Sequence, residues 1–241
     1  MKISYLFISL IVFGGIFVQR VSGFGFAIVA MVFLPRFFPV LESAALVGMV
    51  SMVSNFIVAG RYAKTIRFLP VLIPTIAYFI LSFLVLNFAA DAGTEFLKKV
   101  LGGVMVVFCL FFLFLQNRIR IPANTATGLV CGSLSGAMGG LFSTSGPPMV
   151  VYYLSACKDN AAYLACIQAY FFLTSLYSTV HRAVSGIVTN EVMICFAISI
   201  PCMILGNYVG GKLFDSLNRH WLNRIVYGTL GVSGVLYLLG Y

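Results

Sequence analysis

The chain has 241 residues, of which 61% are hydrophobic and 9% charged, and its mean hydropathy is +1.05. No soluble core of this size hides so much apolar surface, so the composition predicts an all-α polytopic membrane protein without a soluble domain. The formal charge of +9 would suggest nucleic acid in a soluble chain. Here no basic run with interleaved aromatic residues occurs, and the basic residues stand in short joints between apolar stretches. In such joints they set the orientation and face anionic lipid, so we expect membrane lipid and no nucleic acid as a partner.

The residue types that build metal sites and hydrolytic centres are scattered. The six cysteines stand singly in apolar stretches without a C-x-x-C pair, and His181 and His220 are far apart. Neither paired carboxylates nor clustered histidines occur in any predicted span. We therefore expect no metal, no cofactor and no enzymatic activity.

The first apolar run continues past Arg20 and contains a polar interruption. Its start resembles a secretory signal peptide, but Val21-Ser22-Gly23 is a weak cleavage match and the run goes on beyond it. We therefore predict that it belongs to the mature protein. The residues Ser22-Gly23-Phe24-Gly25 interrupt the run before Pro35 closes it, since glycine and proline punctuate helices.

Charged joints separate the later apolar stretches. Six of these are long enough to span the roughly 30 Å of membrane hydrocarbon. They are Ser43–Gly60, Phe68–Ala90, Val100–Asn117, Asn160–His181, Val192–Gly211 and Trp221–Tyr241.

One further apolar stretch, Ile121–Cys157, has no charge and is too long for a single span, since a straight helix of this length would run roughly 55 Å. Its middle reads Gly139-Gly140-Leu141-Phe142-Ser143-Thr144-Ser145-Gly146-Pro147-Pro148. The two prolines remove backbone donors and disfavour a helical conformation at Gly146, so the helix is expected to break here. An unwound backbone in a bilayer is tolerated only where protein buries it or a watery cavity adjoins it. The break therefore predicts a ligand site, the alternative being a kink that serves packing alone.

The two interrupted stretches begin two similar halves. An offset of 123 residues (145 − 22) lays Ser22-Gly23 on Ser145-Gly146 and brings the first three spans onto the last three. The sequence therefore predicts two halves, residues 1–120 and 121–241, in one transport domain. Each half has a broken segment followed by three transmembrane helices.

Each broken segment could cross the membrane once as an interrupted helix, or enter and return as a re-entrant hairpin. If every segment crosses, the basic residues outside the spans divide 7 to 7 between the two sides. If both are hairpins, they divide 5 (Lys2, Arg36, Lys98, Lys99 and Arg182) to 9. Because basic residues are enriched on the cytoplasmic side, the uneven split favours hairpins, with both termini outside. Three spans per half then make the second half inverted relative to the first.

Inverted halves whose broken helices meet near the membrane midplane are the usual construction of a secondary transporter. Helix N-termini and unwound amides present partial positive charge to an anion, and the hydroxyls of Ser22, Ser143, Thr144 and Ser145 add neutral donors. Arg20 lies beside the first break with no acidic residue near it in sequence. It is either a ligand of an anionic substrate or a residue that snorkels to water.

Further polar groups in the spans have two interpretations. Gln168, Ser175 and Ser178 fall on one helix face and could line the pathway, or they could bond between helices as packing. The same alternatives apply to Asn55 with Ser51. His181 closes a span and is our candidate for proton coupling.

The second break and the residues after it, Val150-Val151-Tyr152-Tyr153-Leu154, resemble the second-half motif of the TauE/SafE permeases, a family of sulfite exporters and toluene-sulfonate uptake proteins. Ser22-Gly23-Phe24-Gly25 resembles the first-half counterpart, although Phe24 and Phe26 stand where a richer glycine run is expected. The resemblance extends over the whole chain in length, span number and two-half plan. It implies a multi-pass carrier in the bacterial inner membrane for small sulfur-containing anions such as sulfite, thiosulfate or organosulfonates.

The residues that we expect to bind the substrate lie at or near the two breaks. They are Arg20, Ser22, Gly23, Gly25, Ser143, Thr144, Ser145, Gly146, Pro147 and Gln168. An anion channel, or a carrier of a non-sulfur organic anion, stays open as the alternative function.

Overall fold

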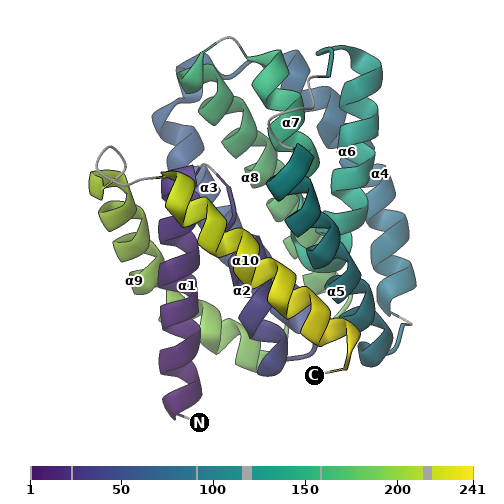
Figure 1. Ribbon diagram of the computed structural model, residues 1–241, viewed down its shortest axis with the longest axis vertical. Coiled ribbons are helices and arrows are strands. Elements are labelled where there is room, and N and C mark those ends of the chain that lie inside the picture. The colour runs from purple at the N-terminus through teal and green to yellow at the C-terminus, as the bar shows by residue number, and fades with distance from the viewer. Residues whose placement is uncertain are drawn as a thin grey trace.

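The computed structural model of the protein describes residues 2–22, 24–90, 92–115, 121–157, 159–213 and 219–240. The side chains of residues 2–4, 22, 90, 115 and 219–225 lie outside this description. Within the described ranges the chain forms helices joined by short turns, with no strand (Figure 1).

Ten α-helices make up the described part of the chain. They are α1 (Lys2–Ser22), α2 (Phe26–Phe33), α3 (Val40–Arg61), α4 (Phe68–Ala90), α5 (Thr94–Leu110), α6 (Thr125–Phe142), α7 (Gly146–Ala156), α8 (Asn160–Val184), α9 (Asn190–Leu213) and α10 (Arg219–Leu238). Two short 3-10 turns, η1 (Leu34–Arg36) and η2 (Ala63–Thr65), flank α3, and a π turn, η3 (Phe111–Leu115), extends α5.

The predicted spans fall on α3, α4, α5, α8, α9 and α10. Among the described residues, four helices are long and apolar enough to cross a membrane: α3, α4, α9 and α5 with its π turn. The 25-residue α8 has a more polar composition than these four. Large apolar side chains lie on the outer surface, such as Phe68, which is 72% exposed. The prediction of an all-α polytopic membrane protein is therefore confirmed.

The chain breaks at both places that the sequence indicates. Residues 143–145 separate α6 from α7, and Ser143 has a φ of 56°, the one positive φ of a non-glycine residue among those described. Gly25 precedes α2 with a φ of 117°, a conformation that glycine adopts without the steric cost of a Cβ.

Both broken segments fold back on themselves. A Cβ added at Gly128, near the start of α6, would lie 3.2 Å from the hydroxyl of Tyr152 on α7. On one straight helix these two residues would be roughly 36 Å apart. Likewise, a Cβ at Gly15 on α1 would lie 3.4 Å from the carbonyl oxygen of Phe26 on α2. The hairpin alternative is therefore the one that the chain adopts, and single interrupted spans are excluded.

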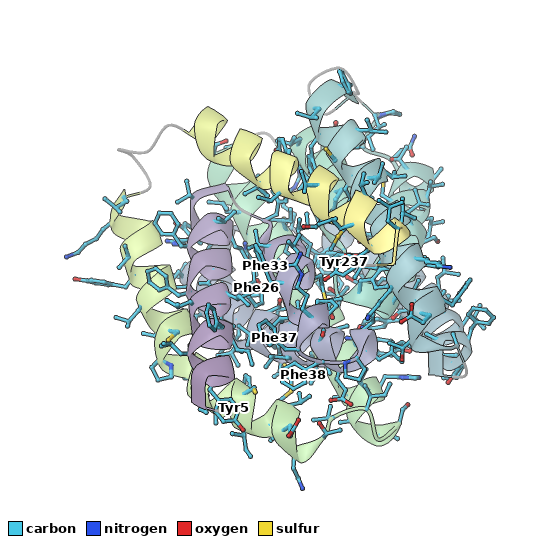
Figure 2. The ribbon with its side chains drawn as sticks, turned by 60° about the horizontal axis from the view of Figure 1, so that its bottom comes forward. Tyr5, Phe26, Phe33, Phe37, Phe38 and Tyr237 are labelled. Carbon is cyan, nitrogen blue, oxygen red and sulfur yellow. The ribbon has the colours of Figure 1, made fainter. Side chains whose placement is uncertain are left out.

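The two hairpins open toward opposite ends of α3. The α1–α2 hairpin ends at the start of α3, where Thr189 Oγ1 donates to Glu42 Oε2 at 3.2 Å. The α6–α7 hairpin ends beyond the last turn of α3, where Arg67 Nη1 donates to Ala156 O at 2.8 Å. The labelled N- and C-terminal ends both lie at the lower end of Figure 1. There the C-terminal end of α10, which carries Tyr237, lies beside α2 (Figure 2), and the hydroxyl of Tyr237 donates to Val32 O at 2.9 Å.

The helix pairs match each other under the offset of 123 residues. Helix α1 packs on α9 and α6 packs on α4, and each of these pairs maps onto the other. The pairs α3 with α8 and α5 with α10 map onto themselves. This pattern supports a two-fold relation, while the inverted orientation and the division into residues 1–120 and 121–241 stay predictions.

Glycines bring α6 close to α4. A Cβ at Gly132 would collide with the backbone of Pro74, and a Cβ at Gly136 would lie 2.7 Å from Tyr78 O. Small residues at such positions let membrane helices pack backbone to backbone. This packing holds α6 so that its C-terminal end, and with it the second break, reaches the interior.

Candidate functional site

The two helix breaks meet at one small cavity, which we call the central cavity. Its volume is about 30 Å³, enough for roughly one or two water molecules. The lining comes from α1, α2, α3, α8 and both breaks. The lining residues are Gln19, Phe24, Gly25, Ala27, Ile28, Ser51, Asn55, Ser143, Thr144, Ser145, Gly146, Phe171 and Ser175.

The N-termini of α2 and α7 both border the central cavity. Gly25 and Ser145 are the residues that precede these helices, and neither helix has a side-chain cap. The N-terminal end of a helix carries partial positive charge on amides that have no partner within the helix. At α7 this amide comes from Gly146, because Pro147 and Pro148 have no N–H. The two helix ends together favour an anion in the cavity.

The hydroxyls at the second break have different environments. Ser143 Oγ donates to Ala44 O at 2.8 Å and accepts from Arg182 Nη1 at 2.8 Å, so protein groups already occupy this hydroxyl. Thr144 is only 4% exposed, and in the described part of the chain its Oγ1 has no hydrogen-bond partner. A buried hydroxyl without a partner costs free energy. A ligand in the cavity that accepts a hydrogen bond from this hydroxyl would recover that cost.

A polar pair from α1 and α3 forms another part of the wall. Gln19 Nε2 donates to Asn55 Oδ1 at 2.7 Å, and both side chains are buried. Ser51 lies one turn earlier on α3 and also faces the cavity. The wall thus combines neutral polar groups with the aromatic rings of Phe24 and Phe171, and no carboxylate of the described residues lines it.

Arg182 is fully buried behind the second break. Its guanidinium donates to Gly139 O at 3.1 Å and Gly140 O at 2.7 Å, as well as to Ser143 Oγ. The one ion pair among the described residues joins Lys98 and Glu95, so no described carboxylate neutralises Arg182. The carbonyl groups at the C-terminal end of α6 offset part of its charge. Ser143 both lines the central cavity and bonds to Arg182, so a buried positive charge lies directly behind this part of the cavity wall.

The structure brings half of the predicted binding residues together at the central cavity. Gly25 and residues 143–146 line the central cavity. Gly23 and the side chain of Ser22 lie outside the described residues. Pro147 is buried in the first turn of α7 and lines a separate apolar cavity.

Three predicted residues are placed elsewhere. Arg20 lines a second cavity between α1, α3 and α9. Gln168 is buried in α8 but is not among the residues that line the central cavity. His181 lies near the end of α8, where its ring centroid is 5.6 Å from that of Phe83.

Gln19 and Arg182 are not among the residues that the sequence predicts for the site. Gln19 is an amide within an apolar run, which is a weak signal that could have been used. Arg182 was counted as a charge of a joint, and no local pattern marks it as buried. Some polar residues of the spans were expected either to line the pathway or to bond between helices. Of these, Ser51, Asn55 and Ser175 line the central cavity, whereas Ser178 forms a 2.8 Å hydrogen bond with Tyr78 on α4.

The fold and the site together define a class, namely polytopic membrane proteins with two helical hairpins whose tips meet at a polar cavity. The family described as "Sulfite exporter TauE/SafE" matches residues 7–237, and the chain belongs to this family. The protein is thus a membrane transporter and not an enzyme, as the sequence predicted.

A curated relative supports the same assignment. It is described as "Probable sulfite/organosulfonate exporter TauE" of Cupriavidus necator and is 22% identical over 230 residues. The matched region covers 93% of this chain and 90% of the relative. No solved structure matches the chain.

Proposed function

We propose that the protein is a secondary transporter that moves a small sulfur-containing anion, such as sulfite, thiosulfate or an organosulfonate, across the bacterial inner membrane. The anion would bind in the central cavity. The observation that carries this proposal is the buried hydroxyl of Thr144, which has no partner among the described residues at a cavity shared by two helix N-termini. A sulfur oxyanion accepts hydrogen bonds from such donors and carries the negative charge that the helix ends favour.

The charge balance around the cavity supports an anion over a cation. In the part of the chain that the structure describes, no carboxylate lines the central cavity, and Arg182 is buried behind Ser143. A bound cation would be repelled by this guanidinium and by both helix ends, whereas an anion would be attracted.

The relative's description supports the substrate class and the direction. That protein is described as a probable sulfite/organosulfonate exporter, and its similarity extends over 93% of this chain. We therefore favour export from the cytoplasm.

The size of the cavity supports a carrier cycle. A volume of about 30 Å³ leaves no room for the organic part of a sulfonate. The hairpin tips, with Phe24 on one and Gly146 on the other, would have to separate to admit it. Such a movement alternately opens a site to the two sides of a membrane.

The test is flux into proteoliposomes that contain the purified protein. Sulfite, thiosulfate, ethanesulfonate and acetate are compared, each with and without a pH gradient. We expect saturable flux of the sulfur oxyanions that responds to the gradient. Flux that rises linearly with concentration and ignores the gradient would instead support a channel, and a preference for acetate would support a carrier of non-sulfur anions.

His181 remains our candidate for proton coupling. It lies near the end of α8 next to Arg182 and in ring contact with Phe83 and Tyr177. We expect His181→Gln to keep anion exchange at equal pH on both sides but to lose the acceleration by a pH gradient. Gradient-driven flux equal to that of the unmodified protein would remove His181 from the coupling mechanism.

A further inference from the structure

A second polar cavity lies between α1, α3 and α9, and we call it the α1–α3–α9 pocket. Its volume is about 410 Å³, far larger than that of the central cavity. Arg20, Arg61 and Lys212 all line it, together with Asn207. Three cationic side chains from three different helices therefore meet around one space.

The room for Arg20 comes from two glycines on α9. A Cβ at Gly210 would lie 2.8 Å from Arg20 Cβ, and a Cβ at Gly211 would lie 3.4 Å from Arg20 Nε. The arginine side chain thus lies along the bare backbone of α9. This packing directs its guanidinium into the pocket instead of toward the central cavity.

The described chain provides no carboxylate for these cations. Among the described residues no acidic side chain lines the pocket, and the one ion pair that they form lies elsewhere, on α5. The ammonium of Lys212 lies over the ring of Tyr208, 4.6 Å from its centroid. Like charges held around one space repel each other, and a bound anion would remove this cost.

The pocket has a charged end and an apolar flank. Arg61 is the last residue of α3, and Lys212 is in the last turn of α9, so both stand where these membrane helices end. Ile57 and Ile204, 37% and 52% exposed, line the pocket further along the same two helices. This arrangement fits an amphipathic ligand whose charged group lies at the membrane edge.

From this geometry we propose that the α1–α3–α9 pocket binds an oxyanion that carries an apolar tail. The sulfonate or phosphate oxygens contact Arg20, Arg61 and Lys212, since guanidinium groups match such oxyanions with paired hydrogen bonds. The tail lies against Ile57 and Ile204. Two sources supply this chemistry, namely an anionic phospholipid of the surrounding membrane and an organosulfonate in solution.

Two hydrogen-bonded pairs of side chains lie between this pocket and the central cavity. Asn207 Nδ2 donates to Ser54 Oγ at 3.0 Å, and the neighbouring Asn55 accepts from Gln19 at 2.7 Å on the side of the central cavity. The pocket is therefore a site of its own. Binding to it is measured without transport, so its failure would leave the proposed function untouched.

The experiment uses the full-length protein in lipid nanodiscs and has two arms. In the first arm, the nanodiscs contain phosphatidylcholine with or without phosphatidylglycerol, and the phosphatidylglycerol bound per protein is counted by native mass spectrometry. In the second arm, the nanodiscs contain phosphatidylcholine alone, and butanesulfonate is titrated by calorimetry. The variant Arg20→Gln/Arg61→Gln/Lys212→Gln is compared with Lys64→Gln/Lys98→Gln/Lys99→Gln, which loses the same charge elsewhere.

We expect the pocket variant to lose binding by about tenfold or more in at least one arm, as for the loss of a charge-assisted hydrogen bond. A loss confined to the first arm identifies the phospholipid as the ligand, and a loss confined to the second identifies the organosulfonate. Lys212→Gln alone changes only a side chain at an exposed helix end, so it tests the site even if the triple variant fails to fold. Equal binding by all variants in both arms, or an equal loss in the control, overturns the proposal.

Discussion

Thr144 is the residue that tests the proposed binding chemistry most directly. Its hydroxyl is buried at the central cavity without a partner among the described residues. We expect Thr144→Val, which keeps the shape and removes the donor, to reduce sulfite flux by about tenfold or more, as for a lost hydrogen bond to a charged group. Initial flux into proteoliposomes measures this effect.

Thr174→Val provides the matched control. This threonine is also buried, but its hydroxyl donates to Tyr170 O at 2.9 Å within α8, away from the cavity. Flux should therefore stay near that of the unmodified protein. If Thr144→Val transported sulfite as fast as this control, the hydroxyl would have no part in binding.

Arg182 supplies both structure and charge to the second break. Arg182→Gln removes the charge and shortens the donor. The carbonyl of Gly140, left without this donor, costs about 1–3 kcal/mol of unfolding free energy, whereas Gly139 O still accepts from Ser143 N at 2.9 Å. Arg182→Lys keeps the charge but loses the planar fork. We expect both variants to melt at lower temperature and only the glutamine variant to show a strongly raised KM for sulfite.

Thermal unfolding in detergent and flux kinetics separate these two roles. Lys99→Gln, on the exposed surface, controls for the loss of one positive charge. An unchanged KM in Arg182→Gln would show that the buried charge does not reach the anion.

The hairpin tips are the elements that set the size of the site. A Cβ at Gly146 would lie 3.7 Å from the ring of Phe24, an ordinary contact, so the fold tolerates Gly146→Ala. The added methyl group nonetheless fills part of a cavity of about 30 Å³. We expect flux of ethanesulfonate to fall more than flux of sulfite, measured as the ratio of the two rates.

Gly103→Ala on α5 is the control, since a Cβ there meets nothing within 4 Å. Its ratio of ethanesulfonate to sulfite flux should match that of the unmodified protein. An unaltered ratio in Gly146→Ala would place the substrate away from the N-terminus of α7.

At the level of single helices, the sequence predicted the helix breaks but not the side chains that surround them. Glycine and proline act locally, so the interruptions around Gly25 and Ser143 follow from the residues themselves. The position of the Arg20 side chain does not follow from its neighbours in sequence. It depends on the space beside Gly210 and Gly211, which are distant in the chain.

The whole molecule is expected to have inverted halves with the more basic joints in the cytoplasm. Single cysteines at Arg36, Lys64, Asn124 and Ser185 test this in a background without the native cysteines. A membrane-impermeant maleimide added to intact cells should label only the cysteines at Arg36 and Ser185, which the predicted topology places outside. Labelling of Asn124→Cys together with Ser185→Cys would contradict the hairpin topology.

The sequence by itself determined the class of the molecule, its spans and the positions of its two breaks, because hydropathy and the backbone preferences of glycine and proline operate over a few residues. Only the tertiary structure decided that both breaks border one cavity, that Arg182 is buried against Ser143, and that Arg20 lies in a different pocket. These placements follow from the packing of helices distant in sequence, such as α3 on α8 and α1 on α9, and no local pattern encodes them.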